Sequence, residues 1–104
     1  MKTVRFHPEA EAEMMEAAAY YEAQQDDLGK RFLASVREAI GKIQINPLLY
    51  PIVDLNVRRC LTKTFPFGVL FRVLPDQIAL LAIMHLHRDP GCWKNRRFEQ
   101  DQGM

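Results

Sequence analysis

The chain has 104 residues, of which 48% are apolar and 26% charged, the composition of a folded domain rather than of a disordered segment. No apolar run approaches the roughly 18 residues of a membrane helix, and the N-terminus resembles neither a signal peptide nor a transit segment. The net charge of +1 is uneven: residues 1–54 carry six Lys and Arg against nine Asp and Glu, and residues 55–104 carry eight against four. We expect one cytoplasmic domain over residues 1–98 and a frayed tail at 99–104. Its basic second half is either an uneven solvated surface or a face for an acidic partner or for phosphates.

The chain starts with the pattern of a strand followed by a helix. Residues 4–6 alternate between apolar and polar, as in a strand. Pro8 suits the first position of a helix and glutamates follow it, although the imidazole of His7 is a poor N-cap. Apolar residues then recur at helical spacing as far as Tyr21, which predicts an amphipathic first helix.

A polar run at residues 24–27 separates this helix from a second one. Either aspartate of the run can cap the second helix, whose apolar stripe extends from Phe32 to Ile43. Pro47 ends it, because the proline ring disfavours helical geometry at the residue before. Two helices joined by a short polar turn predict an antiparallel helical hairpin.

Beyond Pro51 the apolar period changes from 3.6 to 2, which predicts strands at residues 57–64, 67–74 and 77–87. The last of these is apolar on both faces, as in a central strand that is covered from both sides. A short C-terminal helix is expected to start at Asp89. The order β-α-α-β-β-β with this short helix predicts an α+β fold, in which the helical hairpin packs on one face of a small, mainly antiparallel sheet.

A two-residue turn at Pro75 and Asp76 fixes the expected register of the last two strands, with Leu74 opposite Gln77. The pairs expected on the face toward the helices are Phe71 with Leu80, Val69 with Ala82, and Phe67 with Met84. The other face then carries Gly68, Leu70 and Arg72 opposite Leu81, Ile83 and Ala79, followed by His85 and His87. A slip of one residue would exchange the two faces.

Short motifs in a fixed order over residues 4–97 resemble those of a known family. In the first half they are Phe6-His7-Pro8-Glu9-Ala10, Tyr20-Tyr21-Glu22, Leu28-Gly29, Phe32 and Asn46-Pro47. In the second half they are Tyr50-Pro51, Val57-Arg58-Arg59, Phe65-Pro66-Phe67, Phe71-Arg72-Val73, and His85-Leu86-His87-Arg88-Asp89-Pro90 with Trp93 and Arg96. The series resembles the RelE/ParE superfamily of toxins from type II toxin–antitoxin systems, and in particular its ParE-like, plasmid-stabilisation branch.

The resemblance implies a toxin that a cognate antitoxin neutralises and that meets operator DNA only through that antitoxin. Characterised ParE-like members inhibit DNA gyrase without being nucleases, whereas RelE-like members cleave messenger RNA in the ribosome. We therefore expect a ParE-like inhibitor of DNA gyrase with no membrane partner. One alternative is a ribosome-dependent endoribonuclease, and another is a degenerate, non-toxic member that binds the antitoxin and regulates the operon.

A RelE-type nuclease needs cations around the scissile phosphate and a group that moves protons. In the RelE-like pattern an arginine follows the aromatic residue of the third strand, where this chain has Gly68. RelE-like members also carry a tyrosine near the C-terminus, where the nearest aromatic residue here is Trp93. Both differences favour an inhibitor over a nuclease. If the chain is a nuclease, its candidate catalytic residues are Arg58, Arg59, Lys63, Arg72 and His85.

The candidates for binding a target are Arg58, Arg59, Arg72, His87, Arg88, Trp93 and Arg96. Two of them, Arg58 and Arg59, are neighbours on a strand and point to opposite faces. We expect one of them to face the helices and bind an acid of the first half, and the other to face solvent or the target. The strand arginines are also compatible with ion pairs to Glu13, Glu16 or Glu22, and Trp93 with packing against the sheet.

Metal and cofactor sites find little support in the sequence. His85 and His87 have a spacing that two zinc ligands can have, and Cys92 and Asp89 lie close to them in sequence, but nothing else supports a zinc site, so no metal is expected. Cys60 and Cys92 belong to no CxxC motif and are expected to be free thiols. No glycine-rich phosphate loop, catalytic triad or pair of carboxylates stands out, so no cofactor is expected.

Overall fold

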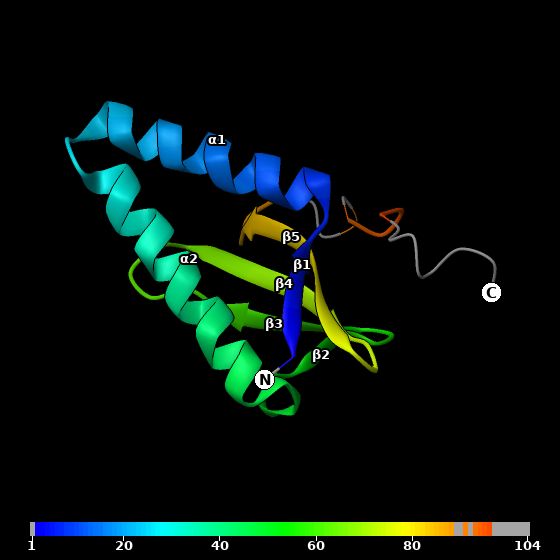
Figure 1. The fold of residues 1–104 in the computed structure, drawn as a ribbon. Coiled ribbons are helices and arrows are strands. Elements are labelled where there is room, and N and C mark those ends of the chain that lie inside the picture. The colour runs from blue at the N-terminus through cyan, green and yellow to red at the C-terminus, as the bar shows by residue number, and fades with distance from the viewer. Residues whose placement is uncertain (1, 89–90, 92, 97–104) are drawn as a thin grey trace.

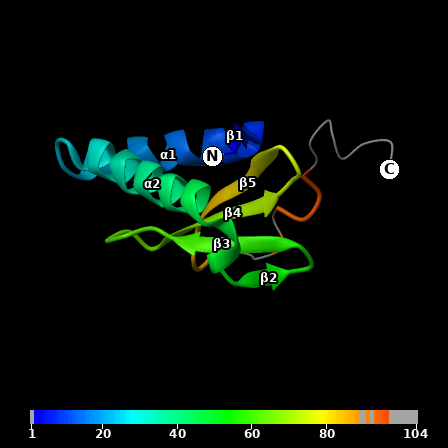
Figure 2. The same ribbon diagram turned by 60° about the horizontal axis from the view of Figure 1, so that its bottom comes forward.

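The structure, a computed structural model that describes residues 2–88, 91 and 93–96, has two helices on one face of a five-stranded sheet (Figure 1). The elements are β1 (Thr3–Phe6), α1 (Pro8–Gln24), α2 (Leu28–Ile45), the 3-10 helix η1 (Pro47–Leu49), β2 (Ile52–Asp54), β3 (Val57–Leu61), β4 (Phe67–Val73) and β5 (Gln77–His85). The strand order is β1-β5-β4-β3-β2, with β1 parallel to β5 and the other pairs antiparallel. Helices and sheet form two layers (Figure 2), which confirms the predicted α+β architecture.

Helix α1 begins at Pro8, as the sequence predicts, but its cap differs from the prediction. The Nδ1 atom of His7 accepts a hydrogen bond from the backbone N–H of Glu9 at 3.1 Å. The expectation that His7 is a poor N-cap is therefore wrong. An imidazole nitrogen that carries no proton is an acceptor, and it serves here as the oxygen of an aspartate or serine cap does elsewhere.

The close approach of the two helices depends on Gly29, in the first turn of α2. A Cβ atom there would lie 2.5 Å from the carbonyl oxygen of Ala18, so a larger residue would push the helices apart. The carboxylate of Glu22 accepts hydrogen bonds from the backbone N–H groups of Asp27 and Gly29, each at 3.0 Å. Asp27 occupies the N-cap position, but its side chain makes no cap hydrogen bond. The predicted aspartate cap is wrong, because Glu22 of the preceding helix already satisfies these amides.

The strands β3, β4 and β5 start where the sequence predicts and end one to three residues earlier. The sequence did not predict β2, which is three residues long and pairs with β3 at two positions, separated by an irregularity in register. Three residues are too few for a period of two to show, so β2 carries no readable pattern. It lengthens the predicted order to β-α-α-β-β-β-β.

The segment that follows β5 forms turns among its described residues, 91 and 93–96. The backbone N–H of Lys94 bonds to the carbonyl of Gly91 at 3.2 Å, and that of Arg96 bonds to the carbonyl of Trp93 at 3.1 Å. The expected start of a C-terminal helix at Asp89 lies outside the described residues. These turns bring Trp93 and Arg96 back to the sheet.

The register of β4 and β5 follows the prediction only near their turn. The backbone N–H of Leu74 bonds to the carbonyl of Gln77 at 2.8 Å, and Phe71 lies opposite Leu80, both as predicted. One step further, Leu70 lies opposite Ala82, so Leu81 is an extra residue on β5 and forms a β-bulge.

The bulge corrects the predicted pairs and faces. Val69 pairs with Ile83 rather than Ala82, and Phe67 with His85 rather than Met84. Ile83 joins the core under the helices, whereas Ala82 and Met84 join the cluster on the opposite face. His85 lies on the helix side, with its ring 5.3 Å from that of Phe67. Alternation along a strand that is apolar on both faces cannot reveal one inserted residue, which is why the prediction failed beyond Leu80.

The sheet separates two apolar clusters. The inner cluster, under α1 and α2, is centred on Phe32, Val36, Ile43, Val69, Phe71, Ile78, Leu80 and Ile83. The outer cluster consists of Val57, Leu70, Ala79, Leu81, Ala82, Met84 and Trp93. Strand β5 is therefore buried on both faces, as predicted. Among the described helices, none is long and apolar enough to cross a membrane.

Candidate functional site

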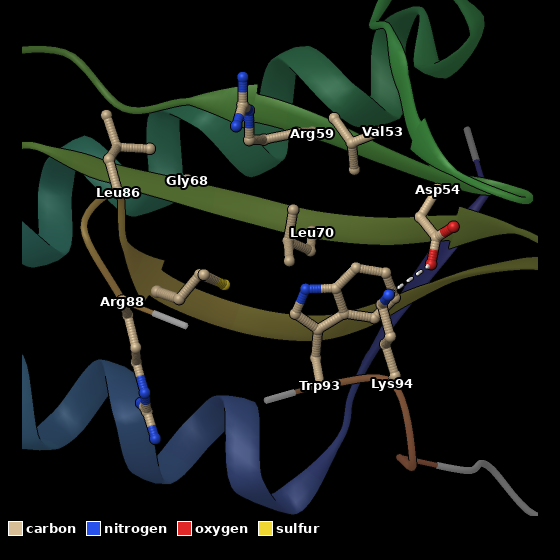
Figure 3. A pocket seen from close by; sticks show the side chains of 10 residues that line it. Val53, Asp54, Arg59, Gly68, Leu70, Leu86, Arg88, Trp93 and Lys94 are labelled. Atoms are coloured by element: carbon tan, nitrogen blue, oxygen red, sulfur yellow. Dashed lines mark ion pairs between the residues drawn. The ribbon is translucent and has the colours of Figure 1, made fainter. Parts of the chain in front are cut away.

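The face of the sheet opposite the helices, called here the outer face, carries a pocket of about 260 Å³ (Figure 3). Its apolar lining residues are Val53, Leu70, Met84, Leu86 and Trp93. Its charged lining residues are Asp54, Arg59, Arg88 and Lys94. Gly68 of β4 completes the lining. The four strands β2 to β5 and the segment that follows β5 therefore all contribute to the pocket.

The three cations at the rim differ in what they bind. Lys94 pairs with Asp54 at 3.7 Å, and the guanidinium of Arg88 leaves the pocket toward α1 (Figure 3). Arg59 is exposed, and among the described residues no acidic side chain pairs with it. The stem of Arg59 lies against Gly68, where a Cβ atom would be 3.1 Å from its Cγ and Cδ atoms. Arg59 is therefore the rim cation that is free to bind an external acceptor.

Behind the pocket, the carboxylate of Glu13 on α1 accepts hydrogen bonds from two arginines, Arg88 and Arg96. The guanidinium of Arg96 donates to both oxygens of Glu13, from Nη1 and Nη2, each at 2.8 Å. Nη1 of Arg88 donates to Oε2 of Glu13 at 2.9 Å. Glu13 and Arg96 are buried, with 9% and 5% of their side chains exposed. A forked, buried contact of this kind is among the strongest that two side chains make.

This pair also completes the hydrogen bonding of β5. Strand β1 ends at Phe6, opposite Leu80, and beyond this point none of the described residues forms a strand beside β5 on that side. There Oε1 of Glu13 accepts from the backbone N–H of Ile83 at 3.1 Å, and Nη1 of Arg96 donates to the carbonyl of Leu81 at 2.9 Å. Two side chains thus take the place of a strand at the bulge, where buried peptide groups need partners.

The importance of Glu13 was not predicted beyond its mention as an ion-pair partner for the strand arginines. A signal was available, because position 13 lies three residues after Ala10 and four before Ala17, inside the apolar stripe of α1. An acid on a buried stripe requires a buried partner. Its observed partners are Arg88 and Arg96 rather than an arginine of a strand.

The structure gives several predicted target-binding residues contacts within the domain. Arg96 is bound to Glu13, and Trp93, with 6% exposure, packs in the outer cluster. Arg88 is half exposed while it holds Glu13. Arg72 lines a second hollow of the outer face, together with Trp93 and Arg96. His87 is exposed beyond the end of β5, and its backbone N–H donates to Nδ1 of His85 at 3.1 Å.

Arg58 and Arg59 point to opposite faces, as the sequence predicts. Arg58 lies on the helix side, where its Nη1 donates to the carbonyls of Tyr50 at 2.6 Å and Leu48 at 3.4 Å. The predicted pairing of the inward arginine with an acid of the first half is therefore wrong. The chain leaving α2 turns through η1 beside β3 and presents carbonyl groups there instead of a carboxylate.

The five candidate nuclease residues do not converge on one place. Arg59 and Arg72 lie on the outer face, whereas Arg58 and His85 lie on the helix side. The last two are opposite Phe71 and Phe67, four residues apart on β4, about 13 Å along a strand. Lys63 is exposed in the connection between β3 and β4, beside α2.

Neither a metal cluster nor a reactive thiol emerges from the described residues. Within residues 2–88, 91 and 93–96, no three His, Cys, Asp or Glu side chains are grouped to hold a metal ion. Cys60 is a free, buried thiol, whereas Cys92 lies outside the described residues. Burial raises the pKa of the Cys60 thiol, and a contact with Tyr50 and the charge of Lys42 oppose that rise. The thiol therefore stays protonated and unreactive near neutral pH.

Comparison with known proteins places this fold in a family. The model of the ParE toxin of the type II toxin–antitoxin system parDE matches residues 4–90. No curated protein matches the chain by sequence. A solved structure from a chromosomal ParDE toxin–antitoxin system of P. aeruginosa has 19% sequence identity and a TM-score of 0.60, covering 82% of this chain and 96% of that one. The structural likeness shows the shared fold, and since the family model spans most of the chain, this protein belongs to the ParE toxin family of type II toxin–antitoxin systems.

Proposed function

We propose that the chain arrests growth by binding and inhibiting DNA gyrase in the cytoplasm, with no chemistry at a site of its own, and that a cognate antitoxin neutralises it. Operator DNA is reached only through that antitoxin. Membership of the ParE family supports the role of toxin. The observation that carries inhibition rather than catalysis is the dispersal of Arg58, Arg59, Lys63, Arg72 and His85 over both faces of the sheet.

Dispersal matters because a nuclease must place several groups on one phosphate. Stabilising the charge of the transition state requires donors within about 3 Å of a single oxygen. The position at which RelE-like members have an arginine is Gly68 here, and Arg59 lies across it. Arg59 is the cation that lies against this position, and the groups of the pocket that could move a proton, Asp54 and Lys94, are paired with each other at 3.7 Å. These features favour a protein that acts by occupying its target.

The target-binding surface that we propose is the outer face, with Arg59 at its centre and Arg72 and Arg88 around it. Arg59 is exposed, and Arg88 is half exposed although it also donates to Glu13. His87 is exposed, but its ring lies 5.3 Å from that of His85 on the helix side, so it is left out of this set. Arg96 and Arg58 have their donors engaged within the domain and are left out of this set. Trp93 contributes by forming the floor of the pocket.

For the antitoxin we propose the apolar groove between the two helices. The helices diverge from their connecting turn, and β1 lies between their far ends (Figure 1). A groove of about 440 Å³ lies there, lined chiefly by Val4, Phe6, Met14, Met15, Leu33 and Ile40. The edge strand β2, with Ile52 and Val53 exposed, offers a second place where an extended segment can add to the sheet.

The target is tested by inducing the chain without its antitoxin and observing the type of damage. Inhibition of gyrase predicts filamentous cells and a DNA-damage response, and the purified chain should block supercoiling by gyrase in vitro. Immediate loss of protein synthesis with cut messages would instead establish a ribosomal nuclease. Normal growth in the presence of soluble, folded protein would establish a degenerate member that only binds the antitoxin.

Binding of the antitoxin is tested by calorimetry at several temperatures. A segment that folds over an apolar groove buries a large area, so the heat-capacity change of binding should be strongly negative. Met15→Asp, in the groove, should weaken the complex, whereas Glu11→Asp on the exposed side of the same helix should not. A heat-capacity change near zero would contradict the proposed groove.

A further inference from the structure

The size of the outer pocket restricts what can occupy it. Its volume of about 260 Å³ is below the roughly 300–1,000 Å³ of sites that hold cofactors or drug-sized molecules. A single large side chain from a partner protein fits such a volume. The floor made by Leu70, Met84 and Trp93 requires that at least part of this occupant is apolar.

The charges at the rim select the polar part of the occupant. Lys94 is engaged with Asp54. Arg88 shares Glu13 with Arg96, which also pairs with Glu9 at 3.6 Å, so two carboxylates balance these two arginines. Arg59 has no such partner among the described residues. An arginine beside an apolar floor matches a carboxylate that accompanies an apolar side chain.

Gly68 explains how Arg59 lies at the rim. Glycine inside a strand weakens it and often marks a place where another group approaches closely. Here that group is the stem of Arg59, at 3.1 Å from where a Cβ atom would be, with Cδ2 of Leu86 at 3.6 Å on the other side. A side chain at position 68 would displace the stem. Because this stem is exposed and flexible, it can yield a few tenths of an ångström to an alanine but not to a branched residue.

We propose that the outer pocket takes one apolar side chain of the protein that this toxin inhibits, while Arg59 at the rim binds the carboxylate of an adjacent acidic residue. In this site Arg59 binds the carboxylate, and Gly68 is the positioning residue that keeps Arg59 over the pocket. The inference rests on the proposed function, in that it requires a protein target. It commits to the target rather than the antitoxin, because the antitoxin groove proposed above lies on the helical side of the molecule and the edge of β2 offers an added strand backbone groups rather than the free charge of Arg59.

The test uses the full chain and two readouts. Growth arrest on induction reports on the pocket whatever the target is, and inhibition of supercoiling by purified gyrase reports on the proposed target. Arg59→Ala should weaken growth arrest and raise the inhibitory concentration at least tenfold, while the melting temperature stays unchanged. Arg31→Ala, which removes an exposed cation of α2, is the matched control and should leave both readouts unchanged.

A pair of changes at Gly68 isolates its positioning role. Gly68→Ala should weaken inhibition less than threefold, and Gly68→Val about as much as Arg59→Ala. In the Arg59→Ala background, Gly68→Val should have no further effect, because the side chain that it displaces is already absent. If Gly68 served only the structure of the strand, Gly68→Val would weaken inhibition further in the Arg59→Ala background. The double variant would then inhibit less than either single variant.

Several outcomes would overturn the inference. One is an Arg59→Ala variant that arrests growth as the parent chain does, and another is additive losses in the double variant. A third is loss of affinity for the antitoxin with toxicity retained, which would assign the pocket to the antitoxin. If the parent chain arrests growth but leaves gyrase active, the gyrase proposal fails while growth still decides the role of the pocket. If the parent chain leaves growth unhindered, both fail.

Discussion

The two faces of the sheet differ in how completely they are covered. On the inner face, Val69, Phe71 and Leu80 have no exposed surface, because α1 and α2 close over them. On the outer face, the described segment that carries Trp93 covers part of the sheet and leaves the pocket open beside Leu70. The same strands thus supply stability on one face and accessible side chains on the other. The comparison indicates where a substitution should change folding and where it should change recognition.

The largest contrast is expected at the bulge, between Ile83 and Met84. Ile83→Lys places an unpaired charge under α1 and should lower the free energy of unfolding by more than about 4 kcal/mol. Met84→Lys should lower it by about 1–3 kcal/mol, because a lysine there can extend through the open pocket to water. Denaturant titrations of both variants measure the difference. The uninterrupted register predicts the reverse order, so a more stable Ile83→Lys variant would refute the bulge.

The next largest effect is expected at Glu13. Glu13→Ala removes the forked carboxylate of the buried guanidinium of Arg96, leaving only the exposed Glu9 at 3.6 Å, and should cost about 3–5 kcal/mol of stability. Glu16→Ala, an exposed acid on the same helix, should stay within about 0.5 kcal/mol of the parent chain. Thermal melts of the two variants provide the comparison. Equal melting temperatures would show that the buried pair contributes nothing to the fold.

A smaller contrast is expected between the neighbouring residues Arg58 and Arg59. Arg58→Ala removes the donor to the carbonyls of Tyr50 and Leu48 and should cost about 1–3 kcal/mol. Arg59→Ala should change stability by less than about 0.5 kcal/mol while reducing toxicity. Melts and a growth assay on both variants separate the two roles. Two variants that melt and poison like the parent chain would exclude this strand from function.

The smallest effect concerns Cys60, and is best measured in a Cys92→Ser background. Because burial raises the pKa of the Cys60 thiol above its ordinary value of 9.0, the folded thiol keeps its proton where the unfolded one loses it. Stability from this residue is full below pH 9 and falls as the pH rises from there toward the raised pKa of the folded thiol. Cys60→Ala should flatten that fall between pH 9 and pH 10. Rapid labelling of native Cys60 by a thiol reagent at pH 7 would contradict its burial.

The sequence predicts the elements whose residues repeat a period over several turns or pairs. The starts of both helices and the starts of β3, β4 and β5 follow from such patterns. It cannot predict β2, which is too short to show a period, or the insertion of Leu81, which leaves an apolar strand apolar. The caps formed by His7 and Glu22 cannot be predicted for another reason. A histidine or a glutamate caps a helix only in a particular local geometry, which the sequence does not show.

The candidate site was predictable in composition but not in arrangement. The list of basic residues contained Arg59 and Arg88, which do meet at the pocket, and the opposite directions of Arg58 and Arg59 followed from strand geometry. The burial of Arg96 could not be predicted, because it depends on Glu13, a residue 83 positions earlier that reaches the bulge of β5. The contact between Gly68 and the stem of Arg59 also could not be predicted, because it depends on how β3 and β4 lie side by side.

The contact between Glu13 and Arg96 has a consequence for synthesis of the chain on the ribosome. Glu13 emerges early, whereas its partner is made 83 residues later. Until Arg96 emerges, the carboxylate has no forked partner, and the carbonyl of Leu81 lacks the hydrogen bond that Arg96 donates. The two helices can pair while translation continues, but the open edge of β5 gains its last partner only after residue 96 has been made. A nascent copy therefore carries a finished helical layer over an incompletely bonded sheet until that point.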